Sequence, residues 1–108
     1  MRPAFPSGRT TAIRDLLARD RVCLEIVHYL TRNSEAADTA RGIAEWWIRR
    51  DLASTHEALL KLQEYGVVQS YAVQDNTFVY VYAKNPNLRQ SLARYLEVLI
   101  APHPVEQL

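Results

Sequence analysis

The sequence predicts an α+β fold in which several short helices surround a single β-hairpin. Three observations lead to this expectation: apolar residues recur at helical spacing before residue 66, two runs rich in valine and tyrosine follow, and one more amphipathic run comes last. The 108 residues are 48% hydrophobic and 23% charged, which is typical of one globular domain. We expect the folded domain to span residues 10–100, between a flexible arm at residues 1–9 and a loose tail at residues 101–108.

Two helices are expected before residue 32. Thr11 is the expected N-cap of the first, over residues 12–19, and Asp20 is the expected N-cap of the second, over residues 21–31. The second helix carries apolar side chains nearly all the way round. A helix of this kind is usually covered on more than one side, and a second subunit is one cover that fits the pattern.

The next two helices are separated by a tight turn at Arg49 and Arg50. After a polar loop at residues 33–38, Thr39 is the expected N-cap of the first of these helices. Asp51 is the expected N-cap of the second helix, and Gly66 ends it. The side chains expected to face inward are Ala40, Ile43, Ala44 and Trp47 on the first helix and Thr55, Ala58, Leu59, Leu62 and Tyr65 on the second.

Two strands and a final helix complete the predicted domain. Residues 67–73 and 78–83 are rich in β-forming side chains, and Asp75-Asn76 between them predicts a tight hairpin turn. Pro86 ends the second strand, and a last amphipathic helix is expected over residues 88–100. This order predicts a winged helix-turn-helix, with a three-helix core, a β-hairpin wing and flanking N- and C-terminal helices. Its recognition helix, beginning near Asp51, would enter the major groove of DNA.

Three stretches of the chain resemble the ArsR-type winged-helix regulators. Residues 26–30 (IVHYL) are similar to the first core helix of that family. Ser54-Thr55, Leu59 and Leu62, followed by YGVV at residues 65–68, are similar to its recognition stretch, and residues 79–86 (VYVYAKNP) to the end of its wing. The helix-and-wing pattern is shared with the related MarR and PadR types. The resemblance implies a DNA-binding domain that forms a homodimer through its outer helices.

Metal sensing is not implied by this resemblance. Metal-sensing members of the family use a cysteine pair beside the recognition helix, or Asp, His and Glu side chains in the last helix. This chain has one cysteine, Cys23, and residues 88–100 contain no histidine and a single acid, Glu97. Cys23 and His28 lie five residues apart and do not share one helix face cleanly. We therefore expect no metal site and no cofactor.

The candidate DNA-binding residues lie on and around the expected recognition helix. Basic side chains near its start would contact phosphates, where helix N-termini already favour anions. Ser54, His56 and Glu57 would face the bases, with Lys61 nearer the backbone. The candidates are Arg41, Arg49, Arg50, Ser54, His56, Glu57, Lys61 and Asn76, the last at a hairpin tip that has no arginine or lysine.

The candidate dimer contacts are leucines on the outer helices. Leu88, Leu92, Leu96 and Leu99 form an apolar stripe on the last expected helix. In the usual arrangement of the family, a second copy of the chain would cover this stripe. Trp46, next to the inward-facing Trp47, is expected to be exposed or to cover a subunit contact. The expected interface consists of Leu16, Leu24, Leu88, Leu92, Leu96 and Leu99.

Charge and composition leave a second function open. Thirteen basic residues face twelve acidic ones, and a net charge of +1 is low for a nucleic-acid-binding protein. A winged helix used as a protein-interaction module, without DNA binding, is therefore the alternative. Dispersed charges and an exposed apolar patch near Trp46 would favour it. The sequence has no catalytic motif, membrane-spanning run or signal-peptide pattern, so we expect a cytoplasmic protein that is not an enzyme, with no identifiable small-molecule ligand.

Overall fold

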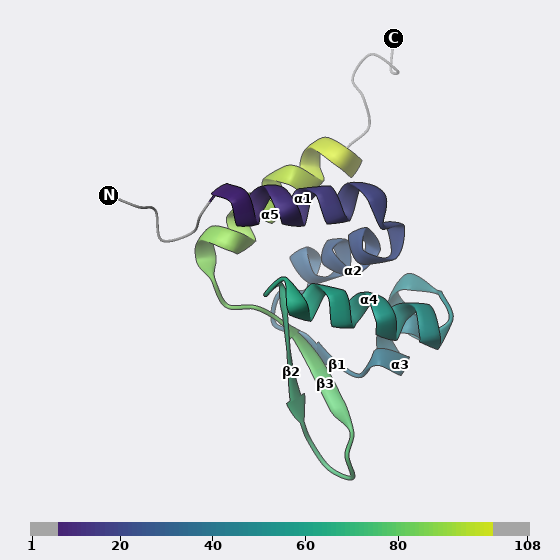
Figure 1. Ribbon diagram of the computed structural model, residues 1–108. Coiled ribbons are helices and arrows are strands. Elements are labelled where there is room, and N and C mark those ends of the chain that lie inside the picture. Colours follow the sequence, from purple (N-terminus) through teal and green to yellow (C-terminus); the bar gives the residue numbers. More distant parts are fainter. Residues whose placement is uncertain (1–6, 101–108) are drawn as a thin grey trace.

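The computed structural model describes the backbone of residues 7–100 and the side chains of residues 10–99. The architecture is α+β, with helices gathered at one end and a β-hairpin projecting from the other (Figure 1). No helix in the described part of the chain is long and apolar enough to cross a membrane. The elements are α1 (Ser7–Arg19), α2 (Arg21–Arg32), β1 (Ala37–Asp38), α3 (Ala40–Gly42), η1 (Ile43–Ile48), α4 (Leu52–Glu64), β2 (Val68–Ala72), β3 (Phe78–Tyr82) and α5 (Pro86–Ile100).

The first helix begins earlier than the sequence predicts. We expected it to start after Thr11 and residues 1–9 to form a flexible arm, whereas α1 already includes Ser7–Arg9. Propensity and capping preferences are weak signals that packing overrides, and α1 packs Ile13, Leu16 and Leu17 into the core. The rest of the expected arm, and the expected tail at residues 101–108, lie outside the described residues.

The sheet is three-stranded and antiparallel, in the order β1-β3-β2. Asp75 and Asn76 have φ angles of 54° and 60°, as in the type I′ turns of tight hairpins, and the Thr77 amide donates to the Gln74 carbonyl at 2.9 Å. The predicted hairpin is therefore confirmed. Strand β1 was missed, because two residues inside the expected loop at 33–38 carry no alternation; pairing with β3 creates this strand.

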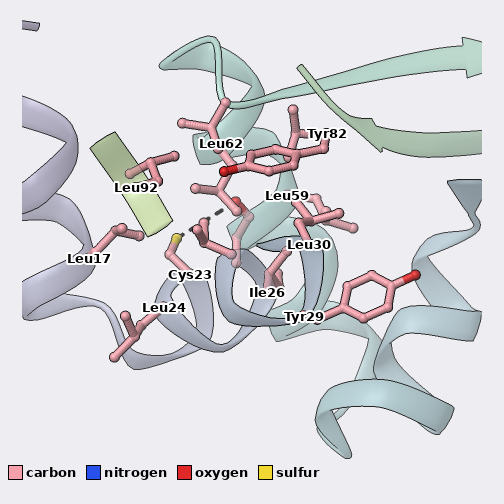
Figure 2. Packing of buried hydrophobic residues seen from close by; sticks show 14 of the residues in the cluster. Leu17, Cys23, Leu24, Ile26, Tyr29, Leu30, Leu59, Leu62, Tyr82 and Leu92 are labelled. Atoms are coloured by element: carbon pink, nitrogen blue, oxygen red, sulfur yellow. Dashed lines mark hydrogen bonds between the residues drawn. The ribbon is translucent and has the colours of Figure 1, made fainter. Parts of the chain in front are cut away.

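Helix α2 lies at the centre of the core (Figure 2), and its buried side chains include Ile26 and Val27 at 0% exposure. Helices α1, α4, α5 and η1 all pack against it. The apolar surface around α2 is thus covered by the chain itself. A second subunit is therefore not needed to cover these side chains, because the buried apolar residues of α2 pack within a single chain.

This packing also corrects the predicted dimer contacts. Five of the six leucines are between 1% and 8% exposed inside a single chain, so they are not available on its surface. They are Leu16, Leu24, Leu88, Leu92 and Leu96. Only Leu99 is exposed, at 42%, and its neighbour Val98 is exposed at 73%. An apolar helical stripe does not distinguish a domain core from a subunit interface, and here the stripe belongs to the core.

The segment after Thr39 is not a regular helix. Thr39 caps it as predicted, accepting from the Gly42 amide at 3.0 Å, but α3 passes after one turn into η1, a π-helix. The wider turn changes which side chains face inward. Ile43 and Ala44 are buried as expected, whereas Trp47, expected in the core, is 50% exposed. Trp46 is 71% exposed.

Candidate nucleic-acid interface

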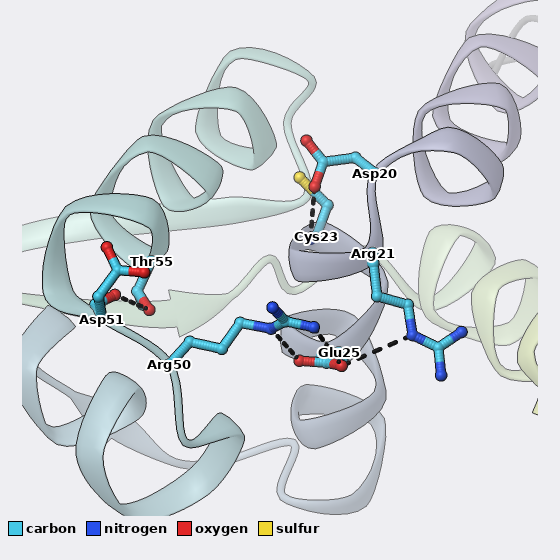
Figure 3. Close-up of polar contacts among 7 residues, drawn as sticks. All are labelled: Asp20, Arg21, Cys23, Glu25, Arg50, Asp51 and Thr55. Atoms are coloured by element: carbon cyan, nitrogen blue, oxygen red, sulfur yellow. Dashed lines mark hydrogen bonds and ion pairs between the residues drawn. The ribbon is translucent and has the colours of Figure 1, made fainter.

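Helix α4 is fixed at its start by capping. The Asp51 carboxylate accepts from the Ser54 amide at 2.8 Å. The Thr55 hydroxyl donates to the Asp51 carbonyl at 2.9 Å (Figure 3). The amide hydrogen bond lowers the pKa of Asp51, because it stabilises the carboxylate. The predicted cap and the inward position of Thr55, which is 0% exposed, are both confirmed.

The outward face of α4 is open to solvent and carries no fully exposed basic side chain. His56 and Glu57, two of the predicted base-facing residues, are exposed, while Ser54 is half-buried beside the cap. Leu52 and Leu60 share this surface at 40% and 50% exposure. Aliphatic side chains therefore share this face with hydrogen-bonding ones.

The turn before α4 places its two arginines differently. Arg50 forms a bidentate pair with Glu25 on α2, at 2.7 and 2.9 Å, and Arg21 reaches the same carboxylate at 3.6 Å (Figure 3). The hydrogen bond from Arg50 is the main reason that the pKa of Glu25 lies below its ordinary value. Arg49 is exposed in the left-handed region at φ 56°, and it pairs with no acid among the described residues.

The other two predicted cations are also paired. Lys61 donates to Asp20 at 3.0 Å, which ties α4 to the start of α2, and Arg41 pairs with Glu45 at 3.2 Å. The hydrogen bond to Asp20 raises the pKa of Lys61. Three of the four predicted phosphate contacts therefore already have a carboxylate partner within the chain. Among the residues that the structure describes, Arg49 is the one of the four without a carboxylate partner.

A hollow of about 470 Å³ lies where α4, α3 and the hairpin meet; we call it the α4–hairpin hollow. It brings the predicted residues Arg41 and His56 together, and it adds Leu52 and Phe78, which the sequence analysis did not select. Phe78 is 49% exposed. Leu52 could have been selected from the sequence, because it is an apolar residue that does not lie on the inward-facing stripe of α4. The remaining lining residues are Thr39, Ala40, Ala53, Thr77 and Tyr80.

The hairpin itself presents apolar side chains rather than cations. Tyr71, Val73 and Phe78 are 54%, 52% and 49% exposed. Asn76, predicted to contact DNA, lies exposed at the tip beside the acidic Asp75. The structure thus leaves the hairpin without any basic residue from Val68 to Tyr82, as the sequence implies.

The single cysteine belongs to the core. Its thiol lies 3.8 Å from the Ala58 carbonyl, to which it donates (Figure 2), and burial raises the pKa of Cys23 to about 12. Among residues 10–99, no three His, Cys, Asp or Glu side chains are placed to hold a metal ion together. No protein-family model, curated protein or solved structure matches the chain.

Proposed function

We propose that this chain is a winged-helix DNA-binding domain and that it regulates transcription as a homodimer, without sensing a metal. The observation that carries the proposal is the open outer face of α4, which lies directly beside a projecting three-stranded hairpin sheet (Figure 1). A helix exposed in this way can enter the major groove while a hairpin follows the adjacent backbone.

The ion pairs suggest different roles for the basic residues around α4. Arg50 binds Glu25 on α2 and Lys61 binds Asp20, the N-cap of α2, so their role is to hold α4 in position. Arg49, beside the N-terminus of α4, is the residue that contacts phosphate, since helix N-termini attract anions. Few phosphate contacts mean weak non-specific affinity and a shallow salt dependence.

Dimerisation would place two copies of α4 on successive half-sites about 34 Å apart, one turn of DNA. The exposed apolar residues at the end of α5, Val98 and Leu99, support a contact there. This contact replaces the leucine stripe that is buried in the core. It also lies away from the hairpin, which leaves the α4 face free in both copies (Figure 1).

The experiment is selection of bound sequences from a pool of random duplexes, followed by fluorescence anisotropy on the selected duplex at several salt concentrations. We expect a palindromic preference with half-sites one turn apart, and affinity that falls as salt rises. Equal, salt-independent retention of all sequences contradicts the proposal. Sedimentation at micromolar concentration tests the dimer, and a clean monomer contradicts that part.

A second function, a winged-helix protein-interaction module, is favoured by one observation. The hairpin exposes Tyr71, Val73 and Phe78 and no cation, which is unusual for a surface that follows phosphates. Replacing Tyr71 and Val73 with serine separates the two functions. A DNA-binding domain keeps its affinity for the selected duplex, whereas a module that docks a protein through the hairpin loses its partner.

A further inference from the structure

A second hollow lies between α2 and η1, and Glu25, the partner of Arg50, is one of its lining residues. Its volume is about 310 Å³, at the lower end of the range for small-molecule sites. We call it the α2–η1 hollow. The residues that carry the argument are Glu25, His28, Tyr29, Arg32 and Trp47.

One wall of this hollow is a fixed aromatic pair. The rings of Tyr29 and Trp47 lie 4.8 Å apart, centroid to centroid, at an interplanar angle of 31°. Both side chains donate a hydrogen bond to the Asp38 carboxylate, the indole N–H of Trp47 at 3.1 Å. Trp47 nevertheless remains 50% exposed. Its rotamer is therefore fixed before any ligand arrives, which lowers the entropic cost of stacking a planar ring on it.

The π-helix is what turns this tryptophan toward the hollow. The spacing from Ile43 predicts Trp47 in the core, but the wider turn of η1 places it over Tyr29 instead. Single π-helical turns are often found at functional sites, because they are less stable than regular helix and are kept for the side chain that they redirect. The half-exposed indole is the side chain redirected here.

The charged side chains that line the hollow are Glu25 and Arg32, and of these two only Arg32 has no charged partner among the described residues. Glu25 is already neutralised by the two hydrogen bonds from Arg50 and by Arg21. Arg32, near the C-terminal end of α2, is exposed and pairs with no acid among residues 10–99. Half-buried His28 lines the hollow one helical turn from Arg32, and its imidazole carries an N–H donor. A guanidinium without a partner at the edge of an aromatic wall suits a carboxylate or sulfonate.

We propose that the α2–η1 hollow binds a small planar aromatic anion, whose ring stacks on Trp47 and whose acidic group pairs with Arg32. The volume admits one ring with a short substituent. Because Glu25 both lines the hollow and holds Arg50, an occupant touches the contact that positions the turn before α4. The binding itself does not depend on whether the chain binds DNA.

The test uses the full ¹⁵N-labelled chain and the two indole N–H signals in its NMR spectrum. Benzoate, benzamide and benzylamine serve as probes, since they share a ring and differ in charge. We expect benzoate to shift the Trp47 signal saturably, with a Kd of about a millimolar for a fragment of this size. The neighbouring Trp46, 71% exposed and outside the hollow, is the internal control and should stay in place.

The relative affinities of the three probes test whether the hollow prefers an anion. Because Arg32 is exposed, we expect benzoate to bind about three- to fivefold more tightly than benzamide, and benzylamine to bind least. Arg32→Gln should reduce the affinity for benzoate to the affinity that the wild-type protein has for benzamide. Arg19 is an exposed arginine beyond the other end of α2, so Arg19→Gln is the matched control and should leave the affinity for benzoate unchanged. Equal shifts from all three probes, an unmoved Trp47 signal, or unchanged benzoate binding in Arg32→Gln would each overturn the proposal.

Discussion

Replacing Tyr82 with phenylalanine is expected to stabilise the protein, although the side chain is 2% exposed and lies in the core. Its hydroxyl is buried and has no hydrogen-bond partner among the described residues. Burial also raises the pKa of Tyr82 to about 12, because the phenolate is even harder to desolvate than the phenol. The contact of Arg89 with the ring, 4.7 Å from guanidinium carbon to ring centroid, persists with phenylalanine.

The size of the effect follows from the cost of an unsatisfied group. A buried polar group without a partner costs about 1–3 kcal/mol, so Tyr82→Phe should raise the free energy of unfolding by about 1 kcal/mol or more. For a domain of about this size, each kcal/mol changes Tm by about 4–8 °C. Thermal and urea unfolding followed by circular dichroism measure both quantities.

The neighbouring tyrosine on the same strand is the matched control. Tyr80 is 7% exposed and its hydroxyl is not among the buried atoms without a partner, so Tyr80→Phe should change stability by less than about 0.5 kcal/mol. A lower Tm for Tyr82→Phe than for the wild type would refute the reasoning, because it would mean that the hydroxyl makes a stabilising hydrogen bond in solution.

Three further predictions concern the proposed interface and the ion pairs that support it. Arg49→Ala should weaken binding to every duplex alike and reduce the salt slope by about one, whereas Arg50→Ala should mainly lower Tm, because Arg50 is paired with Glu25; anisotropy and thermal unfolding separate the two. Leu52, which is 40% exposed on α4, is expected to contact thymine methyl groups in the major groove, so replacing thymine with uracil at the contacted positions should weaken binding about fourfold per lost methyl contact. Leu52→Ala should abolish the difference between the two duplexes, and equal affinity of the wild-type protein for both refutes the prediction. Acid should destabilise the fold, because the pKa values of Asp20 and Glu25 are both lowered in the folded state. Burial alone would raise the pKa of Asp20, but the hydrogen bonds from Lys61 and the Cys23 amide outweigh burial; at Glu25 the hydrogen bond from Arg50 is the main cause. Their stabilisation is present above the unfolded pKa values near 4 and is lost as pH falls through the lower folded values, so Asp20→Asn should flatten the decline in Tm below about pH 5.

Local signals made much of the fold predictable. The side chain of Asp51 and the stripe from Thr55 to Leu62 define α4, because a cap and a helical period are properties of neighbouring residues. Asp75-Asn76 defines the hairpin turn for the same reason, since both residues tolerate positive φ. Strand β1 was not predictable in this way, because it exists only through pairing with β3.

The candidate site was harder to predict than the fold. The carboxylates that neutralise Arg50 and Lys61 lie 25 and 41 residues away in sequence, so the pairs depend on how α2 and α4 pack. The outward turn of Trp47 depends on a π-helix that has no sequence signature in the apolar spacing. Residue type therefore identified the cations near α4, and only the tertiary structure showed which of them have partners.

The most direct test of the proposed function is the affinity of the wild-type protein for double-stranded DNA as salt varies. We predict that the chain enriches a subset of random duplexes and that affinity for the enriched duplex falls with salt at a shallow slope. The slope is shallow because Arg49 is the one predicted phosphate contact that has no carboxylate partner in the described part of the chain. Failure to bind any duplex in low salt, with the protein folded by circular dichroism, contradicts the proposed function.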